Sequence, residues 1–150
     1  MRKLLPLALF LAIAPGLPSC NDGSSLLRAK VIEQRAELVG GPVAMADVGD
    51  FLLENDQIRV AILGAKDSPG PGVYGVSIVD IDLRRPRLDE QNAQGHDRFA
   101  ELFPVANLLV PSPTATQVTV LSDGKDGKEA AIRVDSTPGQ GSCFTLYFPA

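Results

Sequence analysis

The sequence predicts a mainly β protein, with one small antiparallel β-sandwich-like domain that follows a cleaved signal helix. Two observations predict this fold class. Short apolar runs with a period close to two recur between residues 50 and 148, and clusters of Gly, Pro, Asn and Asp separate them. The first twenty residues differ: a basic start, an apolar run and small residues follow one another, as is typical of an export signal.

The export signal ends at a cysteine. Two basic residues precede the apolar run Leu4 to Ile13, which is shorter than the roughly 20 apolar residues of a permanent membrane span. The following "LPSC" resembles a lipobox, in which signal peptidase II cuts between Ser19 and Cys20 after Cys20 has received a diacylglycerol. Pro18 departs from the usual lipobox pattern, and the alternative is an ordinary secretory signal that contains a cysteine.

The lipobox resemblance implies a lipoprotein whose Cys20 carries fatty acyl chains such as palmitate. One acyl chain binds a membrane only marginally, so stable anchoring needs two or more. Asn21 stands where many lipoproteins of the inner membrane have aspartate, which favours the outer membrane, although Asp22 lies nearby. We expect a signal peptide at 1–19, the lipidated cysteine and its tether at 20–35, and a β domain at 36–150.

The composition of the mature chain excludes some partners. Cleavage leaves 131 residues, enough for one modest domain. It removes two of the 14 Lys and Arg residues and no acidic residue, so the net charge changes from −4 to −6. Nucleic-acid phosphates require clustered Lys and Arg, so we expect no nucleic-acid partner. With Cys20 lipidated, Cys143 has no cysteine partner, and the nearby sequence shows no cation that would activate its thiol.

The first elements follow from the apolar periodicity. Residues 27–38 fit either a helix or a short strand. Residues 50–63 predict two strands joined by a tight turn at 54–56, where Asn and Asp tolerate turn backbone. Residues 73–83 predict a further strand with Tyr74, Val76, Ile78 and Asp80 on one face.

The remaining elements complete five or six strands. Residues 84–111 are polar or broken by proline, and 116–135 predict a hairpin around an Asp-Gly turn. The closing "CFTLYF" at 143–148 predicts a last strand with no charge, and Pro149 comes only after its end. An apolar edge of this kind is poorly protected against pairing with another chain. We therefore expect the lipid-free domain to be marginally stable or to self-associate, with the C-terminal strand as the site of association.

Residues 36–134 resemble a known family. The stretches that carry the resemblance are "ELVGGPVAMADVGDFLLENDQIRVAI", "GPGVYGVSIVDIDLRRP", "GHDRFAELFPVANLL" and "VTVLSDGKDGKEAAIRV". They resemble, in order, the amino-terminal β-sandwich module of large, uncharacterised exported bacterial lipoproteins. The resemblance implies an architecture and a location but no activity. Those relatives are much longer, which leaves open whether residues 1–150 are a complete folding unit or a truncated or fused one.

The tail "DSTPGQGSCFTLYFPA" resembles the last glycine motif of bacterial histidine-kinase ATPase domains. Nucleotide binding in that family also needs an asparagine-bearing helix for the metal and an Asp-x-Gly-x-Gly box. Neither precedes the tail, because Lys125 interrupts the spacing in "DGKDG" and no such helix is predicted. Gly139 and Gly141 also suit an ordinary turn before a strand. We therefore expect no nucleotide and no cofactor.

Few residues could carry catalysis. His96 is the single histidine, so a Ser-His-Asp, Cys-His or zinc site would depend on it, and we expect it in a surface loop. Asp80 and Asp82 lie two apart on a predicted strand and share a face, which makes them weak candidates for a cation site. A solvated strand face balanced by Arg84 and Arg85 is the simpler interpretation, and we expect no metal.

The sequence thus predicts a lipid-anchored protein of the bacterial cell envelope that is not an enzyme and has a structural or binding role. Its predicted partner is membrane lipid, bound through the acylated Cys20. The alternatives are a carbohydrate-interacting β module or the truncated start of a larger surface protein. With two tyrosines and no tryptophan, the chain has little aromatic surface for stacking on sugars.

Overall fold

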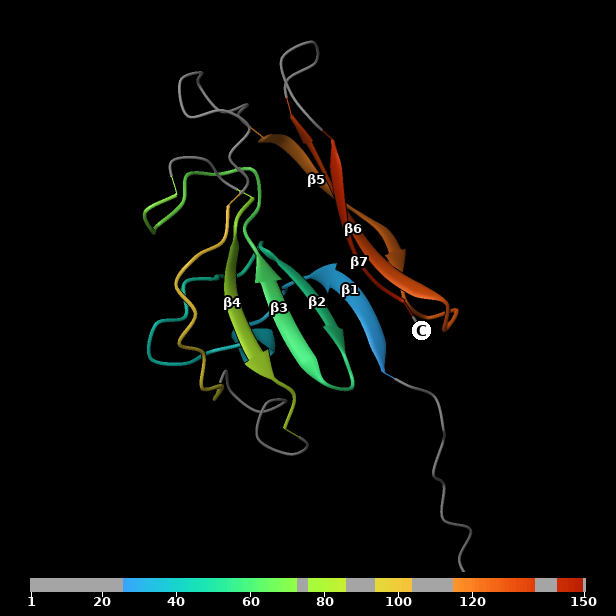
Figure 1. Ribbon diagram of the computed structural model, residues 1–150, viewed down its shortest axis with the longest axis horizontal. Helices are drawn as coiled ribbons and strands as arrows, with labels where there is room; N and C mark the ends of the chain where they lie inside the picture. The colour runs from blue at the N-terminus through green and yellow to red at the C-terminus, as the bar shows by residue number, and fades with distance from the viewer. Residues whose placement is uncertain (1–25, 73–75, 86–93, 104–114, 137–142, 150) are drawn as a thin grey trace, which may run out of the picture.

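Seven strands form two antiparallel sheets in this computed structural model, which describes residues 26–72, 76–85, 94–103, 115–136 and 143–149 (Figure 1). The four-stranded sheet has the order β1 (Leu27–Val31), β2 (Phe51–Asn55), β3 (Ile58–Ile62) and β4 (Ile78–Leu83). The three-stranded sheet has the order β5 (Ala115–Asp123), β6 (Glu129–Ser136) and β7 (Phe144–Pro149). One short 3-10 helix, η1 (Arg35–Glu37), follows β1. The predicted β-sandwich-like class is confirmed.

The core between the sheets comes from period-two alternation. Leu53 on β2 and Val60 and Ile62 on β3 are buried in one cluster with Ile132 on β6. Fully burying such a side chain stabilises the fold by about 1.5–3 kcal/mol. β1 lies against β5 and β6, and β2 lies against β6 and β7, so the sheets meet mainly through β1 and β2.

The outer face of the four-stranded sheet is buried as well. A second apolar cluster contains Leu52, Ala61 and Val79 from the sheet together with Ile32 and Val39 from the segment that follows β1. Antiparallel sheets commonly leave one face in water. Here the connections between strands cover that face, so its polar side chains are buried and need partners.

A β-bulge changes the predicted alternation of β4. The register passes from Ala61 opposite Asp80 to Ile62 opposite Ile78, which leaves Val79 as the extra residue. Ile78 therefore packs against the core between the sheets, whereas Asp80 lies on the outer face. The expectation that Ile78 and Asp80 share a face is wrong, because one inserted residue reverses the alternation.

The sequence predicts either a helix or a short strand between Leu27 and Leu38, and the structure has a strand followed by a short helix. The first part of this segment is strand β1, paired with β2, and its second part contains the single turn of η1. Leu27–Val31 is thus part of the β domain, although it lies within the tether predicted at 20–35. The turn after β2 also lies slightly later than predicted, because the side chain of Asn55 accepts hydrogen bonds from the backbone N–H groups of Gln57 and Ile58, both at 2.9 Å.

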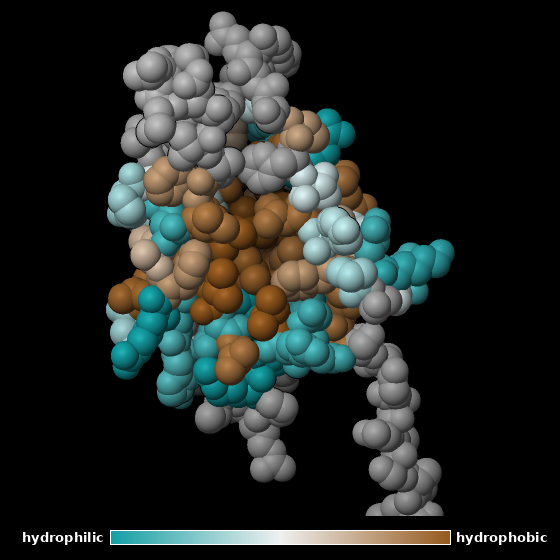
Figure 2. Space-filling view, viewed as in Figure 1, coloured by the Kyte–Doolittle hydropathy of each residue, from teal (hydrophilic) through white to brown (hydrophobic). Residues whose placement is uncertain are grey.

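The inner face of β3 and β4 is only partly covered. Ile58, Ile78 and Ile81 are half-buried on one sheet, as are Leu146 and Phe148 on β7. Figure 1 shows the two sheets diverging from β1 towards β4, and Figure 2 shows an apolar area at the centre of the same view. Among the described strands, β7 pairs only with β6. Its other edge is the one that the sequence predicts to be available for pairing with another chain.

The first prediction concerns this edge. In lipid-free protein covering residues 21–150, the substitution Tyr147→Lys should reduce self-association, because a lysine on an edge strand opposes pairing with a second chain. Tyr147 is 61 % exposed, so its replacement leaves the core intact. Light scattering with a parallel thermal melt measures the effect.

The matched control is Leu121→Lys. Leu121 is 55 % exposed on β5, the opposite edge of the same sheet, so the control removes a similar apolar surface elsewhere. An unsubstituted protein that is monomeric and melts sharply at high temperature would contradict the prediction. Equal effects of the two substitutions would contradict the role of β7.

Candidate functional site

A row of charged residues crosses the outer face of the four-stranded sheet. Arg28 on β1 pairs in register with Glu54 on β2, Glu54 pairs with Arg59 on β3, and Arg59 pairs with Asp82 on β4. The signs alternate from strand to strand. Opposite charges directly across an antiparallel pair attract, whereas like charges repel. This register therefore places Glu54 and Arg59 each between two charges of the opposite sign.

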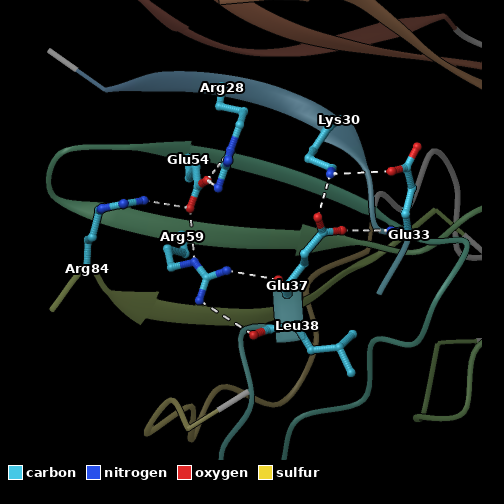
Figure 3. A network of polar contacts seen from close by, with 8 residues as sticks. All are labelled: Arg28, Lys30, Glu33, Glu37, Leu38, Glu54, Arg59 and Arg84. Carbon is cyan, nitrogen blue, oxygen red and sulfur yellow. Dashed lines mark hydrogen bonds and ion pairs between the residues drawn. The ribbon is translucent and has the colours of Figure 1, made fainter. Parts of the chain in front are cut away.

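Glu54 is the centre of the row (Figure 3). Its side chain is fully buried and contacts three guanidinium groups, those of Arg28, Arg59 and Arg84. The nitrogens of Arg59 and Arg84 each lie 3.0 Å from Oε2, and Arg28 pairs with Oε1. A buried carboxylate is costly unless it is paired and hydrogen-bonded, and here both oxygens are engaged.

The same row holds the 3-10 turn against the sheet. Arg59, with its side chain 3 % exposed, donates a hydrogen bond of 2.8 Å to the carbonyl of Glu37 and a longer one, of 3.5 Å, to that of Leu38. Lys30 pairs with the Glu37 carboxylate at 2.7 Å, and that carboxylate also accepts the backbone N–H of Glu33 at 2.8 Å. These bonds compensate for the short length of η1, whose single turn has little stability of its own.

A hollow of about 250 Å³ opens beside the row, lined by Arg28, Ala36, Glu37, Glu54 and Arg59. Many proteins bind an acidic ligand by placing guanidinium groups around the carboxylate of that ligand. In this protein the carboxylate belongs to Glu54, and Arg59 also donates to two backbone carbonyls. The charged groups of the row therefore form ion pairs and hydrogen bonds with one another and with the backbone, so a structural role accounts for them.

Asp80, one of the two cation-site candidates, is fully buried on the same face. Its oxygens accept backbone N–H groups from Met45 at 2.7 Å and Ala46 at 3.2 Å. Burial, aided by the neighbouring charges of Asp97 and Asp50, raises the pKa of Asp80 to about 6 in spite of these two hydrogen bonds. Asp80 thus fastens the segment around Met45 to β4.

Asp82, the other candidate, fastens a different segment. It pairs with Arg85 through both oxygens and accepts the backbone N–H of His96 at 2.6 Å. Burial opposes ionisation, but the Arg85 ion pair and the N–H donors of His96 and Leu83 hold the pKa of Asp82 below its usual range. The prediction that Asp80 and Asp82 share a face agrees with the register, which places them opposite Ala61 and Arg59.

Two further buried carboxylates complete this face. Asp50 pairs with Lys66 at 2.8 Å and accepts the N–H of Gly64 at 3.0 Å. Asp97 accepts the N–H groups of Ile81 at 2.9 Å and Phe99 at 3.1 Å through Oδ1, while its buried Oδ2 has no hydrogen-bond partner among the residues that the structure describes. No group of three or more His, Cys, Asp or Glu side chains in the described ranges has the geometry to hold a metal ion.

The two other reactive side chains lie apart. His96 is exposed in the segment beside β4, whereas Cys143 is exposed next to β7 on the other sheet. The thiol of Cys143 lies close to the side chains of Arg133 and Asp135 on β6. Arg133 is a cationic neighbour that the local sequence did not reveal, because strand pairing brings it close. Cys143 and His96 do not form a nucleophile–base pair.

The predicted lipidation and cleavage residues, Ser19 and Cys20, lie outside the described residues, as do Gly139 and Gly141 of the tail motif. None of the described helices is long and apolar enough to span a bilayer. The chain matches no protein-family model, no curated protein and no solved structure.

The second prediction concerns the charge row. Glu54→Gln should lower the free energy of unfolding by about 3–5 kcal/mol, because it removes the one buried negative charge that three arginines share. Urea unfolding followed by circular dichroism measures the change.

Glu33→Gln is the matched control for this substitution. The Glu33 side chain is 74 % exposed and lies 3.9 Å from Lys30, so its loss should have little effect. A Glu54→Gln protein as stable as the Glu33→Gln protein would show that the row does not stabilise the fold.

The third prediction concerns pH. Asp80 titrates near its ordinary value of 3.8 in the unfolded chain and near 6 in the folded one, so the folded state binds more protons within this window. The contribution of Asp80 to stability is therefore greatest in acid and falls by roughly 3 kcal/mol as the pH rises through 6. Asp80→Asn should consequently destabilise the protein more at pH 4 than at pH 7.5.

Asp82→Asn provides a control on the same strand, because the pKa of Asp82 is shifted in the opposite direction. The lowered pKa of Asp82 contributes stability above the ordinary value of 3.8 and loses it only as the pH falls below that value, so this substitution should cost about the same at pH 4 and at pH 7.5. Unfolding free energies of both variants and the unsubstituted protein at the two pH values decide the matter. Parallel pH trends in the two variants would contradict the assignment.

Proposed function

We propose that the protein is a lipid-anchored component of the bacterial cell envelope, and that its β domain has a structural or binding role. The observation that carries the proposal is the order of features in the first twenty residues. Basic residues, a short apolar run and "LPSC" at residues 17–20 follow one another as in exported lipoproteins. A diacylated or triacylated Cys20 would anchor the chain stably, which a single acyl chain would not.

The chemistry of the described residues favours a non-catalytic role. Catalytic carboxylates need access to a substrate, but Asp50, Asp80 and Asp97 are fully buried and bind backbone N–H groups of neighbouring segments. The exposed His96 and Cys143 lie on separate parts of the fold. A protein of this kind acts through its surface, by contact with lipid or with another envelope molecule.

The carbohydrate-binding alternative has less support. Sugar-binding surfaces use exposed aromatic rings as stacking platforms. Among the described residues, Tyr147 is the one aromatic side chain in the set of large, well-exposed apolar residues. A single ring at a strand edge is a small platform, so we favour a role that does not depend on sugar stacking.

The fourth prediction tests the anchor. Cys20→Ala should move the protein from the membrane fraction to the soluble fraction and abolish its labelling by an alkyne fatty-acid probe in growing cells, because the cysteine of the lipobox, which is the predicted site of acylation, is gone. Cys143→Ala, which removes the other cysteine of the chain, should leave both properties unchanged. Persistent labelling of the Cys20→Ala protein would refute the lipoprotein assignment.

A further inference from the structure

The distance between the predicted anchor and the folded domain is short. Leu26, the first described residue, comes six residues after Cys20, and six residues span at most about 20 Å even when fully extended. The backbone N–H of Leu26 donates a 2.6 Å hydrogen bond to the side chain of Asp56, in the turn between β2 and β3. The point at which the chain enters the domain is thus fixed to that turn.

The turn between β5 and β6 lies at the same end of the domain. Gly124 has a φ of 82°, and a Cβ atom there would collide with the carbonyl oxygen of Leu27, so the turn sits directly on the start of β1. In Figure 1 the start of β1 and the β2–β3 turn lie at the lower end of the four-stranded sheet, and the β5–β6 turn lies at the lower end of the three-stranded sheet, on the side of β1.

We call this end the entry pole and define it by Leu26, Asp56 and residues 123–128 of the β5–β6 turn. Its side chains are mostly charged: Lys125 pairs with Asp123, and the backbone N–H of Lys128 donates to Asp126. A groove of about 520 Å³ beside it follows β1 and is lined in part by Lys125. A charged surface of this kind suits the polar headgroup layer and does not enter the hydrocarbon.

We propose that the entry pole faces the lipid headgroups, with the domain standing on the membrane and the start of β5 pointing away from it. The inference rests on the proposed anchor at Cys20. β5 rises about 3.3 Å per residue, so Thr116 lies about 23 Å along the strand from Asp123. In the inverted orientation the start of β1 would lie farther from the membrane than the tether reaches. The surface available to other envelope molecules is then the opposite end of both sheets.

Fluorescence quenching in vesicles tests this orientation. The lipidated full-length protein, purified from membranes, carries Cys143→Ser so that its exposed thiol does not react. A single new cysteine is introduced either by Lys125→Cys at the entry pole or by Thr116→Cys at the other end of β5; both residues are exposed. Each variant is labelled with the fluorophore NBD and reconstituted into phosphatidylcholine vesicles that contain lipids with a nitroxide on the headgroup.

We expect the label at residue 125 to be quenched severalfold more strongly than the label at residue 116. Equal quenching would mean that the domain lies on its side or tumbles freely, and stronger quenching at residue 116 would mean that it is inverted; either result overturns the orientation. Co-flotation of each labelled protein with the vesicles is measured in parallel. Protein that floats but shows equal quenching retains the anchor without the orientation, whereas protein that fails to float overturns the proposed function as well.

Discussion

The buried carboxylate of Glu54 is the constraint on which the four-stranded sheet depends. An unpaired ion at this position would cost several kcal/mol, so the fold must bring cations to it. Arg28 and Arg59 reach Glu54 from the two neighbouring strands because all three residues are in register. A slip of one residue would place Leu53 among the arginines and Glu54 in the apolar core. The charge row thus specifies pairing that apolar packing alone would fix less strictly.

The other carboxylates of the outer face extend the same principle to the loops. Asp80 binds the segment at Met45, and Asp82 binds the segment at His96. For Asp97 the roles are exchanged: the carboxylate lies in the neighbouring segment and accepts the backbone N–H of Ile81 on β4. The bond from Ile81 satisfies a backbone group of β4, and the bonds to Asp80 and Asp82 hold neighbouring segments against this strand. Side-chain carboxylates on this face therefore accept backbone N–H groups that the backbone of further strands would accept in a larger sandwich.

The fold class could be predicted from the sequence, because alternation and turn residues are local signals. Two features could not be predicted in this way. The bulge at Val79 depends on how β4 pairs with β3, and nothing in "VSIVDIDL" marks the extra residue. The burial of Asp80 and Asp82 depends on loops distant in the sequence, so a solvated strand face was the natural expectation. The Glu54–Arg59 pair was within reach of the sequence, since a two-residue turn at Asp56 and Gln57 sets these residues opposite each other. The predicted turn at 54–56 includes Glu54 itself, so the prediction did not reveal the pair.

The edge of β7 that pairs with no other described strand and the partly covered face of β3 and β4 are two aspects of one geometry. β7 lies over β2, so the three-stranded sheet ends before it reaches β3. A strand added to the free edge of β7 would continue the sheet over β3 and would cover Ile58 and Ile81, which are now half-buried. Backbone pairing and apolar burial would then favour the same contact, and each would strengthen the other. The tendency of this domain to self-associate is thus expected to follow from the offset between its sheets as well as from the composition of its last strand.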